Sequence, residues 1–270
     1  MITEMVRPTA EADNVAVKKE MQEKYDSVGK GILSNYKGRS PQVAESLILG
    51  HRQPGLYWME HKIDTAFALG RFSRADRLLE VGCTAGHYTM KLARDGYRVV
   101  GLDISAESIK AAQVLAQDLG LHQTEFIAAD VEDMRGVPDN SFDGAFSFST
   151  LRYIPDPVRS LREIRRVLKP GGRAVVDFPN KYCPWFELLK FLVGGERHIH
   201  DHTYSTGQVR RMMQQAGFVS IQVKRIIFFW KGMPGSLTPL YKATDFLFER
   251  TPVLNYFAGI IMCKGEKIGA

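Results

Sequence analysis

Residues 78–86 read LLEVGCTAG, a strand-like apolar run that enters a glycine turn. An acidic residue, Glu80, lies two positions before the first glycine, Gly82. Its carboxylate can reach an ammonium group directly or through water. Gly82 and Gly86 lack a Cβ, so a ligand can approach the backbone of the turn closely. This spacing predicts a binding turn for a small molecule that carries an amine.

The turn fits neither of two common phosphate-binding patterns. A dinucleotide fingerprint needs the order G-x-G-x-x-G, but the frame from Gly82 places Thr84 and His87 at its second and third positions. Both side chains would crowd a pyrophosphate on the N-terminus of the following helix. No G-K-S/T follows, as a phosphate loop would require. The turn therefore argues against an NAD(P)-dependent oxidoreductase, which we keep as an alternative.

Two further acids stand at the ends of expected strands. Asp103 ends the second strand, 21 residues after Gly82, and Asp130 ends the third. An acid in the position of Asp103 can accept both hydroxyls of a ribose. Each acid alone could be an ordinary strand-end residue or a cap. Their joint spacing favours one ligand site, because ligands of doubly wound sheets bind beyond the carboxyl ends of the strands.

The elements that would position these acids alternate strictly from residue 77 onward. Strand-like runs occur at 77–82, 97–103, 124–130, 141–149, 173–179, 220–230 and 256–265. Helical patterns separate them, such as 87–96, which ends at Gly96, and a helix that Ser105 can cap. This alternation implies right-handed crossovers and an α/β fold with a parallel, doubly wound sheet.

The turn resembles the first motif of class I (Rossmann-like) S-adenosylmethionine-dependent methyltransferases, E/D-x-G-x-G-x-G, with Thr84 in place of the middle glycine. The stretches SFDGAFSFSTLRYIPDP and LKPGG match the fourth strand of that family, the loop after it and the turn into the fifth strand. The resemblance covers about residues 57–232. It implies a seven-stranded, mostly parallel sheet with an antiparallel last strand, helices on both faces and an N-terminal helical lid.

Within the family, FDGAFSFSTLRYI is similar to the ubiquinone/menaquinone C-methyltransferases and to methyltransferases of natural-product pathways, whereas the C-terminal third matches the quinone enzymes poorly. The resemblance implies S-adenosyl-L-methionine as cofactor. Asp130 would bond the adenine amino group and Val131 would pack on the ring, and one N-terminal aromatic residue would close over the site. The expected cofactor-binding residues are Glu80, Gly82, Cys83, Thr84, Gly86, Asp103, Ile104, Asp130, Val131, Ser147 and Tyr25.

Candidate catalytic residues lie in two loops. Three histidines alternate in the segment 196–204, and His200 or His202 could act as a general base. A metal site of these histidines and simple scaffolding of the loop are the alternatives, and we predict no metal. Arg152, after the fourth strand, could orient an anionic or carbonyl group of the acceptor, or form a surface salt bridge.

The domain prediction has two parts. Residues 1–56 form a tail and a helical lid, with a loose tail to residue 14, a short helix at about 15–26 and a loop from residue 29. Residues 57–270 form the methyltransferase domain, which begins with a helix at about 57–70 and carries a cap-like insert at about 233–255. The insert is rich in apolar residues. It could pack on the sheet or on a second copy, cover the pocket or dip into a membrane.

Composition limits the partners. The net charge of +6 is mild, and no zinc spacing or long basic run points to nucleic acid. No apolar run reaches the length of a membrane span, the start does not read as a secretory signal, and three distant cysteines suggest no disulfide framework. We therefore expect a cytoplasmic protein, with a homo-oligomer or a peripheral membrane contact as candidate associations.

The leading function is methyl transfer to oxygen or carbon of a small, hydrophobic acceptor: a quinone, polyketide, terpenoid or lipid-like compound. The apolar stretch 184–194 favours such an acceptor. A non-catalytic module that retains the cofactor fold is a second alternative, beside the oxidoreductase. Neither an added basic domain for RNA nor the proline-rich signature of protein methylation after the fourth strand is visible.

Overall fold

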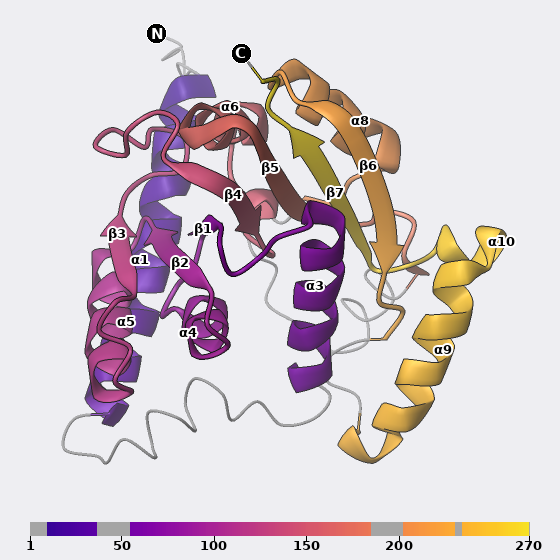
Figure 1. Ribbon diagram of the computed structural model, residues 1–270, viewed down its shortest axis with the longest axis horizontal. Helices are drawn as coiled ribbons and strands as arrows, with labels where there is room; N and C mark the ends of the chain where they lie inside the picture. The colour runs from indigo at the N-terminus through magenta and orange to yellow at the C-terminus, as the bar shows by residue number, and fades with distance from the viewer. Residues whose placement is uncertain (1–9, 37–54, 185–201, 230–233, 270) are drawn as a thin grey trace, which may run out of the picture.

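The computed structural model describes residues 10–36, 55–184, 202–229 and 234–269. The described strands form one seven-stranded sheet in the order β3-β2-β1-β4-β5-β7-β6 (Figure 1). The strands from β3 to β5 pair in parallel, whereas β7 runs antiparallel to β5 and β6. The predicted fold, a doubly wound, mostly parallel sheet with an antiparallel last strand, is therefore confirmed.

The elements follow the alternation expected from the sequence. The strands are β1 (Arg77–Val81), β2 (Arg98–Asp103), β3 (Glu125–Ala128), β4 (Phe142–Ser147), β5 (Leu168–Pro179), β6 (Val219–Ile226) and β7 (Ile260–Glu266). The helices are α1 (Ala10–Tyr36), α3 (Gly55–Gly70), α4 (His87–Arg94), α5 (Ala106–Asp118), α6 (Pro157–Val167), α8 (Thr206–Gln215), α9 (Thr238–Arg250) and α10 (Pro252–Asn255), with short 3-10 turns η1 (Leu151–Tyr153) and η2 (Gly235–Leu237).

Alternating side chains bury both faces of the sheet. Leu78 belongs to a core cluster with Met59 of α3 and Leu92 of α4. Its neighbour Leu79 belongs to the opposite cluster, with Leu161 of α6. Figure 1 accordingly shows α6 and α8 on one side of the sheet and α3 and α4 on the other. With both faces covered, a ligand can reach the sheet at the ends of its strands, and ligands of doubly wound sheets bind at the carboxyl edge.

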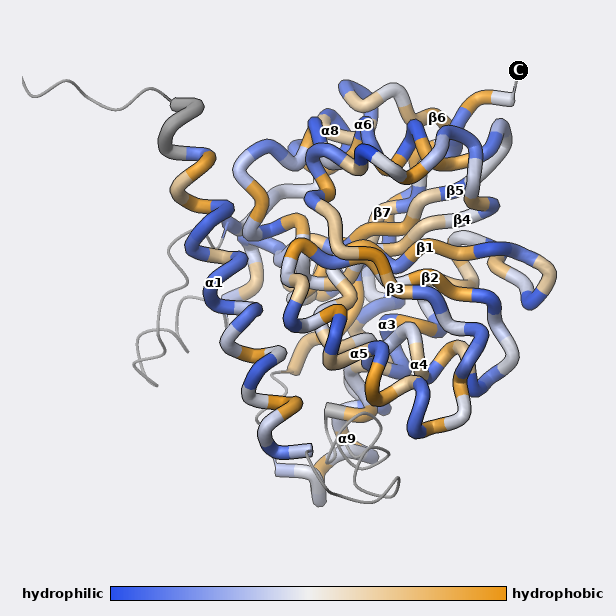
Figure 2. The backbone as a smooth tube through the Cα atoms, turned by 90° about the vertical axis from the view of Figure 1, so that its left-hand side faces the viewer, coloured by the Kyte–Doolittle hydropathy of each residue, from blue (hydrophilic) through white to orange (hydrophobic). Residues whose placement is uncertain are grey.

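Helix α1 differs from the expected short helix, since it runs from Ala10 to Tyr36. The predicted loop from residue 29 is wrong, because Gly29 lies inside this helix. A Cβ at Gly29 would lie 2.4 Å from the backbone of Glu107 and of Ser108, at the start of α5. The glycine therefore permits a close approach of two helices instead of ending one. Figure 2 shows α1 running along the outside of the molecule beside α5.

Side chains fix α1 to α5 along its length. The Tyr36 hydroxyl donates to Asp118 at 2.6 Å, and the Ser105 hydroxyl donates to Asp26 at 2.6 Å. Ser105 also caps α5, as expected, by accepting a hydrogen bond from the Ser108 backbone. These contacts bring α1 next to the carboxyl end of β2.

The apolar insert folds into α9 and α10. Asp245 of α9 is buried, accepts a hydrogen bond from the Tyr57 hydroxyl of α3 at 2.7 Å and accepts another from the Phe228 backbone at 2.8 Å. His61 of α3 lies 2.5 Å from Glu249 of α9. Polar contacts thus fix α9 beside α3. None of the described helices is long and apolar enough to cross a membrane.

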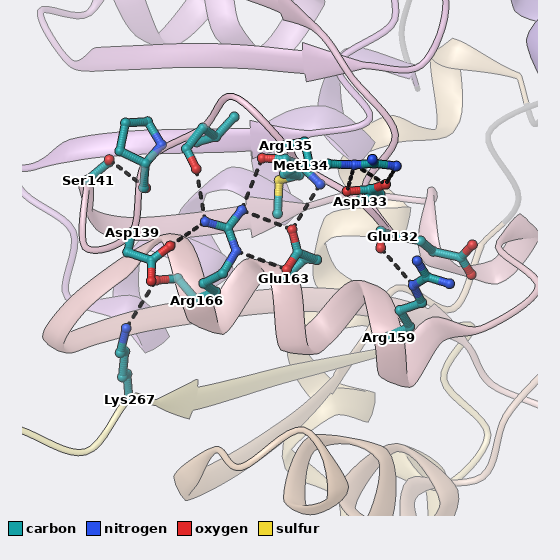
Figure 3. A network of polar contacts seen from close by, with 12 residues as sticks. Glu132, Asp133, Met134, Arg135, Asp139, Ser141, Arg159, Glu163, Arg166 and Lys267 are labelled. Atoms are coloured by element: carbon teal, nitrogen blue, oxygen red, sulfur yellow. Dashed lines mark hydrogen bonds and ion pairs between the residues drawn. The ribbon is translucent and has the colours of Figure 1, made fainter.

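An arginine network holds the loop between β3 and β4 (Figure 3). Arg166 of α6 forms two hydrogen bonds of 2.9 Å with the Glu163 carboxylate, donates to the carbonyl oxygens of Met134 and Val137, and contacts Asp139 at 2.5 Å. Glu163 in turn accepts a hydrogen bond from the Met134 backbone. The planar guanidinium serves this role because it presents several donors in fixed directions. The loop that begins with the predicted adenine site is therefore attached to α6.

Candidate active site

The glycine turn has the left-handed backbone that its sequence suggests. The φ angles of Gly82, Thr84 and Gly86 are 79°, 49° and 80°. Thr84 is β-branched, and such residues rarely adopt a positive φ, which explains why the resembled family usually has glycine in its place. Its backbone N–H donates to Asp103 Oδ2 at 2.9 Å. This bond to the neighbouring strand helps to hold Thr84 in its unfavourable conformation.

Packing inside the protein also requires glycine at both positions of the motif, Gly82 and Gly86. A Cβ at Gly82 would lie 2.1 Å from the hydroxyl oxygen of Thr150, in the loop after β4. A Cβ at Gly86 would lie 2.7 Å from the ring of Phe126 in β3. The glycines thus allow the turn after β1 to pack against the loop after β4 and against β3, in addition to leaving the turn open to a ligand.

Asp103 occupies the end of β2 as a nearly buried carboxylate, 7% exposed. Besides Thr84, the Ser105 backbone donates to it at 3.0 Å. Burial raises the pKa of Asp103, although backbone hydrogen bonds from Ser105, Thr84 and Ile104 oppose the rise. Backbone donors hold both oxygens in place, and each oxygen keeps a lone pair that a ribose hydroxyl could use.

Glu80 lies deeper, with 2% of its surface exposed. It accepts a hydrogen bond from the hydroxyl of Thr89 in α4. Burial raises the pKa of Glu80 to about 7, and the negative charge of Asp103 adds to the rise, against the opposing hydrogen bonds from Thr89. A cationic amine nearby would favour the ionised form of this carboxylate.

Asp130 lies two residues beyond the end of β3, in a short bridge with Asp133. Its Oδ1 accepts a hydrogen bond from the Glu132 backbone at 2.8 Å, and its Oδ2 accepts one from Lys18 of α1 at 2.7 Å. Lys18 also forms an ion pair with the buried Glu132 carboxylate. Burial lowers the pKa of Lys18, but the bonds to the two acids outweigh it and raise the pKa overall. Helix α1 therefore reaches the predicted adenine site directly.

Two cavities meet at the glycine turn. The smaller, of about 70 Å³, is lined by Lys18 and Met21 of α1 and by the predicted residues Asp103, Ile104, Asp130 and Val131. The larger, of about 480 Å³, is lined by Glu80, Cys83 and the rings of Trp58, Tyr88 and Phe148, among others. The residues that line both cavities are Tyr25, Gly82, Thr84, Thr150 and Tyr153. A ligand that spans the junction would have its base and sugar in one cavity and its amine in the other.

The structure brings most predicted cofactor residues to these cavities, with two exceptions. Neither Ser147 nor Gly86 is among the described residues that line them. The Ser147 hydroxyl is buried and donates to the Val81 carbonyl at 2.8 Å, across the β1–β4 pair. The sequence motif gave no means of distinguishing this sheet contact from a ligand contact.

The predicted catalytic residues are placed only in part. Arg152 lines the larger cavity, with its guanidinium 5.2 Å from the Tyr153 ring. His202 is exposed, and its backbone N–H donates to the Arg152 carbonyl at 3.3 Å. His200 lies outside the described residues. The catalytic roles of all three stay predictions.

Sequence reasoning missed several residues of the larger cavity, among them Lys62, Ser149 and Asp177. Lys62 lies in α3, before the first motif, and Asp177 lies in β5, after the last one that we used. The available signal was a lysine among the apolar residues Met59, Ile63 and Ala66 of a helix, where a charge needs a partner. Its partner could not be found because the two lie 115 positions apart in the chain.

The acceptor set of the site fits S-adenosyl-L-methionine. The three carboxylates at the sheet edge, Glu80, Asp103 and Asp130, match three donors of that molecule: its amine, its ribose hydroxyls and its adenine amino group. The turn with Thr84 at its middle position suits a cofactor that has no pyrophosphate. Fold and site together therefore define the S-adenosylmethionine-dependent methyltransferase class.

Comparison with known proteins agrees with this class. Residues 79–176 match the family described as a methyltransferase domain, so the chain carries a methyltransferase domain. An S-adenosyl-L-methionine-dependent Diels-Alderase, iccD of Talaromyces variabilis, is 29% identical over 74% of this chain and 77% of its own length. The ubiquinone biosynthesis O-methyltransferase of Xanthomonas oryzae pv. oryzae is 32% identical over 44% of this chain, which thus spans about half of that relative, 49% of its length.

Solved structures agree on the fold. The [4+2]-cyclase SpnF matches with a TM-score of 0.56 and 24% identity over 78% of this chain and 81% of its own. The YcgJ protein of Bacillus subtilis matches with a TM-score of 0.55 and 19% identity over 78% of this chain and all of its own, 100%. The resemblance to class I methyltransferases and the S-adenosyl-L-methionine cofactor predicted from the sequence are confirmed, and a dinucleotide-dependent oxidoreductase is not favoured.

Proposed function

We propose that this protein transfers the methyl group of S-adenosyl-L-methionine to an oxygen or carbon atom of a small, hydrophobic acceptor. The junction of the two cavities at Gly82, Thr84 and Thr150 supports the proposal. Carboxylates suited to the cofactor flank this junction, and the larger cavity extends from it between the rings of Trp58 and Phe148. Quinones, polyketides, terpenoids and lipid-like alcohols have the apolar surface that such a wall accommodates.

The residues of the chain mainly bind and orient. When bound, the cofactor supplies a methyl group that its positive sulfur has already activated, so placement of the nucleophile is the main task of the site. Glu80, Asp103 and Asp130 would hold the amine, the sugar and the base. Tyr25 and Tyr153 line the junction and would exclude water from it. Arg152 and the histidines of the 196–204 segment remain our candidates for orienting the acceptor and removing its proton.

Calorimetric titration with S-adenosylhomocysteine tests the cofactor site. We expect saturable binding at one site per chain, and no binding of a reduced nicotinamide dinucleotide in the same assay. Binding of the dinucleotide alone would contradict the proposal. Incubation with methyl-labelled S-adenosylmethionine and extracts of the producing cells would then show which small molecules take up label.

A second candidate is cycloaddition. The relative that matches the larger share of this chain, iccD, is described as a Diels-Alderase, and its match extends over 74% of this chain, against 44% for the quinone O-methyltransferase. In that case an extract component would be converted into a product of unchanged mass, and no label would leave the cofactor. Mass spectrometry of the same incubations distinguishes the two reactions.

We also propose that the protein is cytoplasmic. It would associate either with a second copy of itself or with the surface of a membrane. Exposed apolar side chains of α9 and α10 support an association, including Leu240, Phe246, Leu247 and Val253. Fractionation of the producing cells would test the location. Retention by phospholipid vesicles would test the membrane contact.

A further inference from the structure

A buried lysine–aspartate pair forms part of the wall of the larger cavity. Lys62 of α3 and Asp177 of β5 are 3% and 2% exposed, and both line the cavity. Asp177 Oδ2 lies 2.8 Å from Lys62 Nζ, outside hydrogen-bonding angles, so the contact is an ion pair. Buried ion pairs contribute little net stability, because desolvation offsets their attraction. The pair therefore needs a reason beyond joining α3 to the sheet.

Ser149 connects the pair to the loop after β4. Its hydroxyl accepts a hydrogen bond from Lys62 at 2.7 Å, and its backbone N–H donates to Asp177 Oδ1 at 2.6 Å. Its φ of 56° is uncommon for a residue other than glycine, and such backbone strain is found preferentially at functional sites. Lys62, Ser149 and Asp177 thus form one connected group, which we call the lysine cluster.

The lysine cluster lies next to the glycine turn. Thr150, which follows Ser149, is the residue whose hydroxyl oxygen would lie 2.1 Å from a Cβ at Gly82. An acceptor atom bound by Lys62 would accordingly be near the junction where the methyl group is expected. Among the described residues that line this cavity, Arg152 is the other lysine or arginine, and it lies in the following turn.

The environment of Lys62 favours an anionic oxygen. Its ammonium lies 5.8 Å from the ring centres of both Trp58 and Phe148, so these aromatic faces and Asp177 help to hold it in place. An ammonium has three N–H donors. Among the described residues, Ser149 accepts a hydrogen bond from one of them, and Asp177 pairs with the charge without a hydrogen bond. A further donor can serve an oxygen atom of an aromatic ligand between these rings.

We propose that the lysine cluster binds an acidic hydroxyl, a phenol or an enol on an aromatic acceptor, in its ionised form. This inference rests on the proposed function and narrows it to transfer onto oxygen. The hydroxyl proton leaves to solvent as the acceptor binds. A lone pair of the oxyanion then forms the bond to the methyl carbon while the carbon–sulfur bond breaks, and that electron pair stays on sulfur, so the two opposite charges neutralise each other. Asp177 acts as a positioning residue for Lys62.

A chromogenic phenol tests this binding without knowledge of the natural acceptor. We would add 4-nitrophenol to protein saturated with S-adenosylhomocysteine, at a pH below the pKa of the free phenol. Wild-type protein should increase the visible absorption band of the phenolate, since the lysine cation stabilises the ionised form. Lys62→Met should lose this increase while its affinity for S-adenosylhomocysteine changes by less than about threefold.

Lys264→Met is the matched control, because Lys264 is also a buried lysine, 5% exposed, that pairs with an acid, Glu266, and it is not among the described residues lining either cavity. This variant should keep the wild-type phenolate band. If Lys62→Met fails to fold by circular dichroism, the double variant Lys62→Met/Asp177→Leu replaces the whole pair by apolar groups, which proteins often tolerate.

Three outcomes would overturn the inference. They are the absence of a phenolate increase in the wild-type complex, a full increase in the Lys62 variants, or a loss of cofactor affinity of roughly tenfold or more in Lys62→Met, which would assign the lysine to the cofactor instead. Failure of wild-type protein to bind S-adenosylhomocysteine would contradict the proposed function itself, and calorimetry separates that failure from these.

Discussion

Single residues at the carboxyl edge combine structural and binding tasks. Thr84 adopts a backbone conformation that favours glycine, and it donates its backbone N–H to Asp103. Asp103 in turn is buried and held by backbone donors before any ligand arrives. Such a carboxylate is preorganised, because little conformational freedom remains to be lost when a ribose binds. Glu80 differs from it, since its ionisation depends on what lies beside it.

The raised pKa of Glu80 makes cofactor binding pH-dependent. With a pKa of about 7, much of this carboxyl is protonated in the free protein below neutrality. The cofactor amine requires the carboxylate, so binding at low pH must first release a proton. We expect the affinity for S-adenosylhomocysteine to rise by roughly tenfold between about pH 6 and pH 8 and then to level off. Titration calorimetry across this range measures it.

Glu80→Gln provides the control, because it cannot ionise. Its affinity for S-adenosylhomocysteine should be lower than that of wild type at pH 8 and should not change over the same pH range.

The free energy of unfolding of the ligand-free wild-type protein should fall with pH, whereas its affinity for the cofactor rises. The folded pKa exceeds the usual value of 4.5, so ionisation costs stability as the pH rises from about 4.5 to about 7. Glu80→Gln does not bear this cost, so it should be more stable than wild type at pH 8. This advantage over wild type should be smaller at pH 4. A wild-type affinity that is independent of pH would contradict the assignment of the amine to Glu80.

Replacement of Asp103 tests the ribose site. Asp103→Ala removes a charged acceptor, so cofactor binding should weaken by about 1.5–3 kcal/mol, or roughly 10- to 150-fold. Asp76→Ala is a matched control, since Asp76 also accepts a backbone hydrogen bond, from Ser73 at 2.8 Å, and is not among the residues that line the two cavities. Isothermal titration should find near-normal affinity in the control. Near-normal affinity in Asp103→Ala as well would remove the basis for the ribose assignment.

Among the elements, helix α1, which we predict to act as a lid, is also fixed to the domain by close contacts. Gly29 allows it to touch the start of α5, which follows Asp103, the predicted ribose-binding acid, in the chain. Lys18, nearer the start of the same helix, bonds to Asp130 at the predicted adenine site. A displacement of α1 would thus alter both halves of the smaller cavity. The helix does this without a strongly apolar face, since its anchors are mainly polar bonds and one close backbone contact.

A pair of glycine substitutions tests whether α1 packs closely on α5 at Gly29. Gly29→Ala would place a Cβ 2.4 Å from backbone atoms of α5, so we expect a loss of about 1–3 kcal/mol in the free energy of unfolding and weaker cofactor binding. Gly31→Ala has no atom within 4 Å of the added Cβ and should stabilise α1 by about 0.5–1 kcal/mol. Urea unfolding measures both. Equal stabilisation by the two substitutions would show that α1 does not pack on α5 in this way.

For the molecule as a whole, α9 and α10 carry apolar side chains that no other part of the described chain covers. Phe246, Leu247 and Val253 are 61%, 58% and 72% exposed, although Tyr241 and Asp245 on α9 are buried. Helix α9 is therefore anchored by one side and presents apolar groups on another. Clusters of exposed apolar residues of this kind commonly mark association surfaces.

We expect this surface to mediate self-association. Phe246→Glu with Leu247→Glu should raise the dissociation constant of an oligomer by at least roughly tenfold, because each buried apolar side chain contributes about 1.5–3 kcal/mol. Sedimentation velocity over a range of concentrations measures the change. Val15→Glu is the control, as an exposed apolar residue on α1. A wild-type protein that stays monomeric at all concentrations would exclude self-association and leave the membrane contact to be tested with vesicles.

The order of the elements, and the prediction of a cofactor site at the carboxyl edge of the sheet, followed from local sequence. Strand-length apolar runs alternate with amphipathic helices, and this alternation leaves few ways to build a sheet. The acids Glu80, Asp103 and Asp130 were recognisable because each lies at or just beyond the end of such a run. Boundaries were less accurate, as for β5, which begins at Leu168 and not at residue 173. A strand can be extended by pairing with its neighbours, and a local sequence pattern does not show this pairing.

Only the tertiary structure shows which other residues lie near these acids. Lys62 and Asp177 attract attention only when α3 and β5 are packed together, since a charge is costly to bury without its partner. Similarly, Gly29 reads as a helix breaker until α5 lies against it. Sequence determines what each segment can do by itself, through propensity, period and spacing. Contacts between distant segments depend on the packed fold, because burial and distance exist only there, and they decided both the wall of the larger cavity and the length of α1.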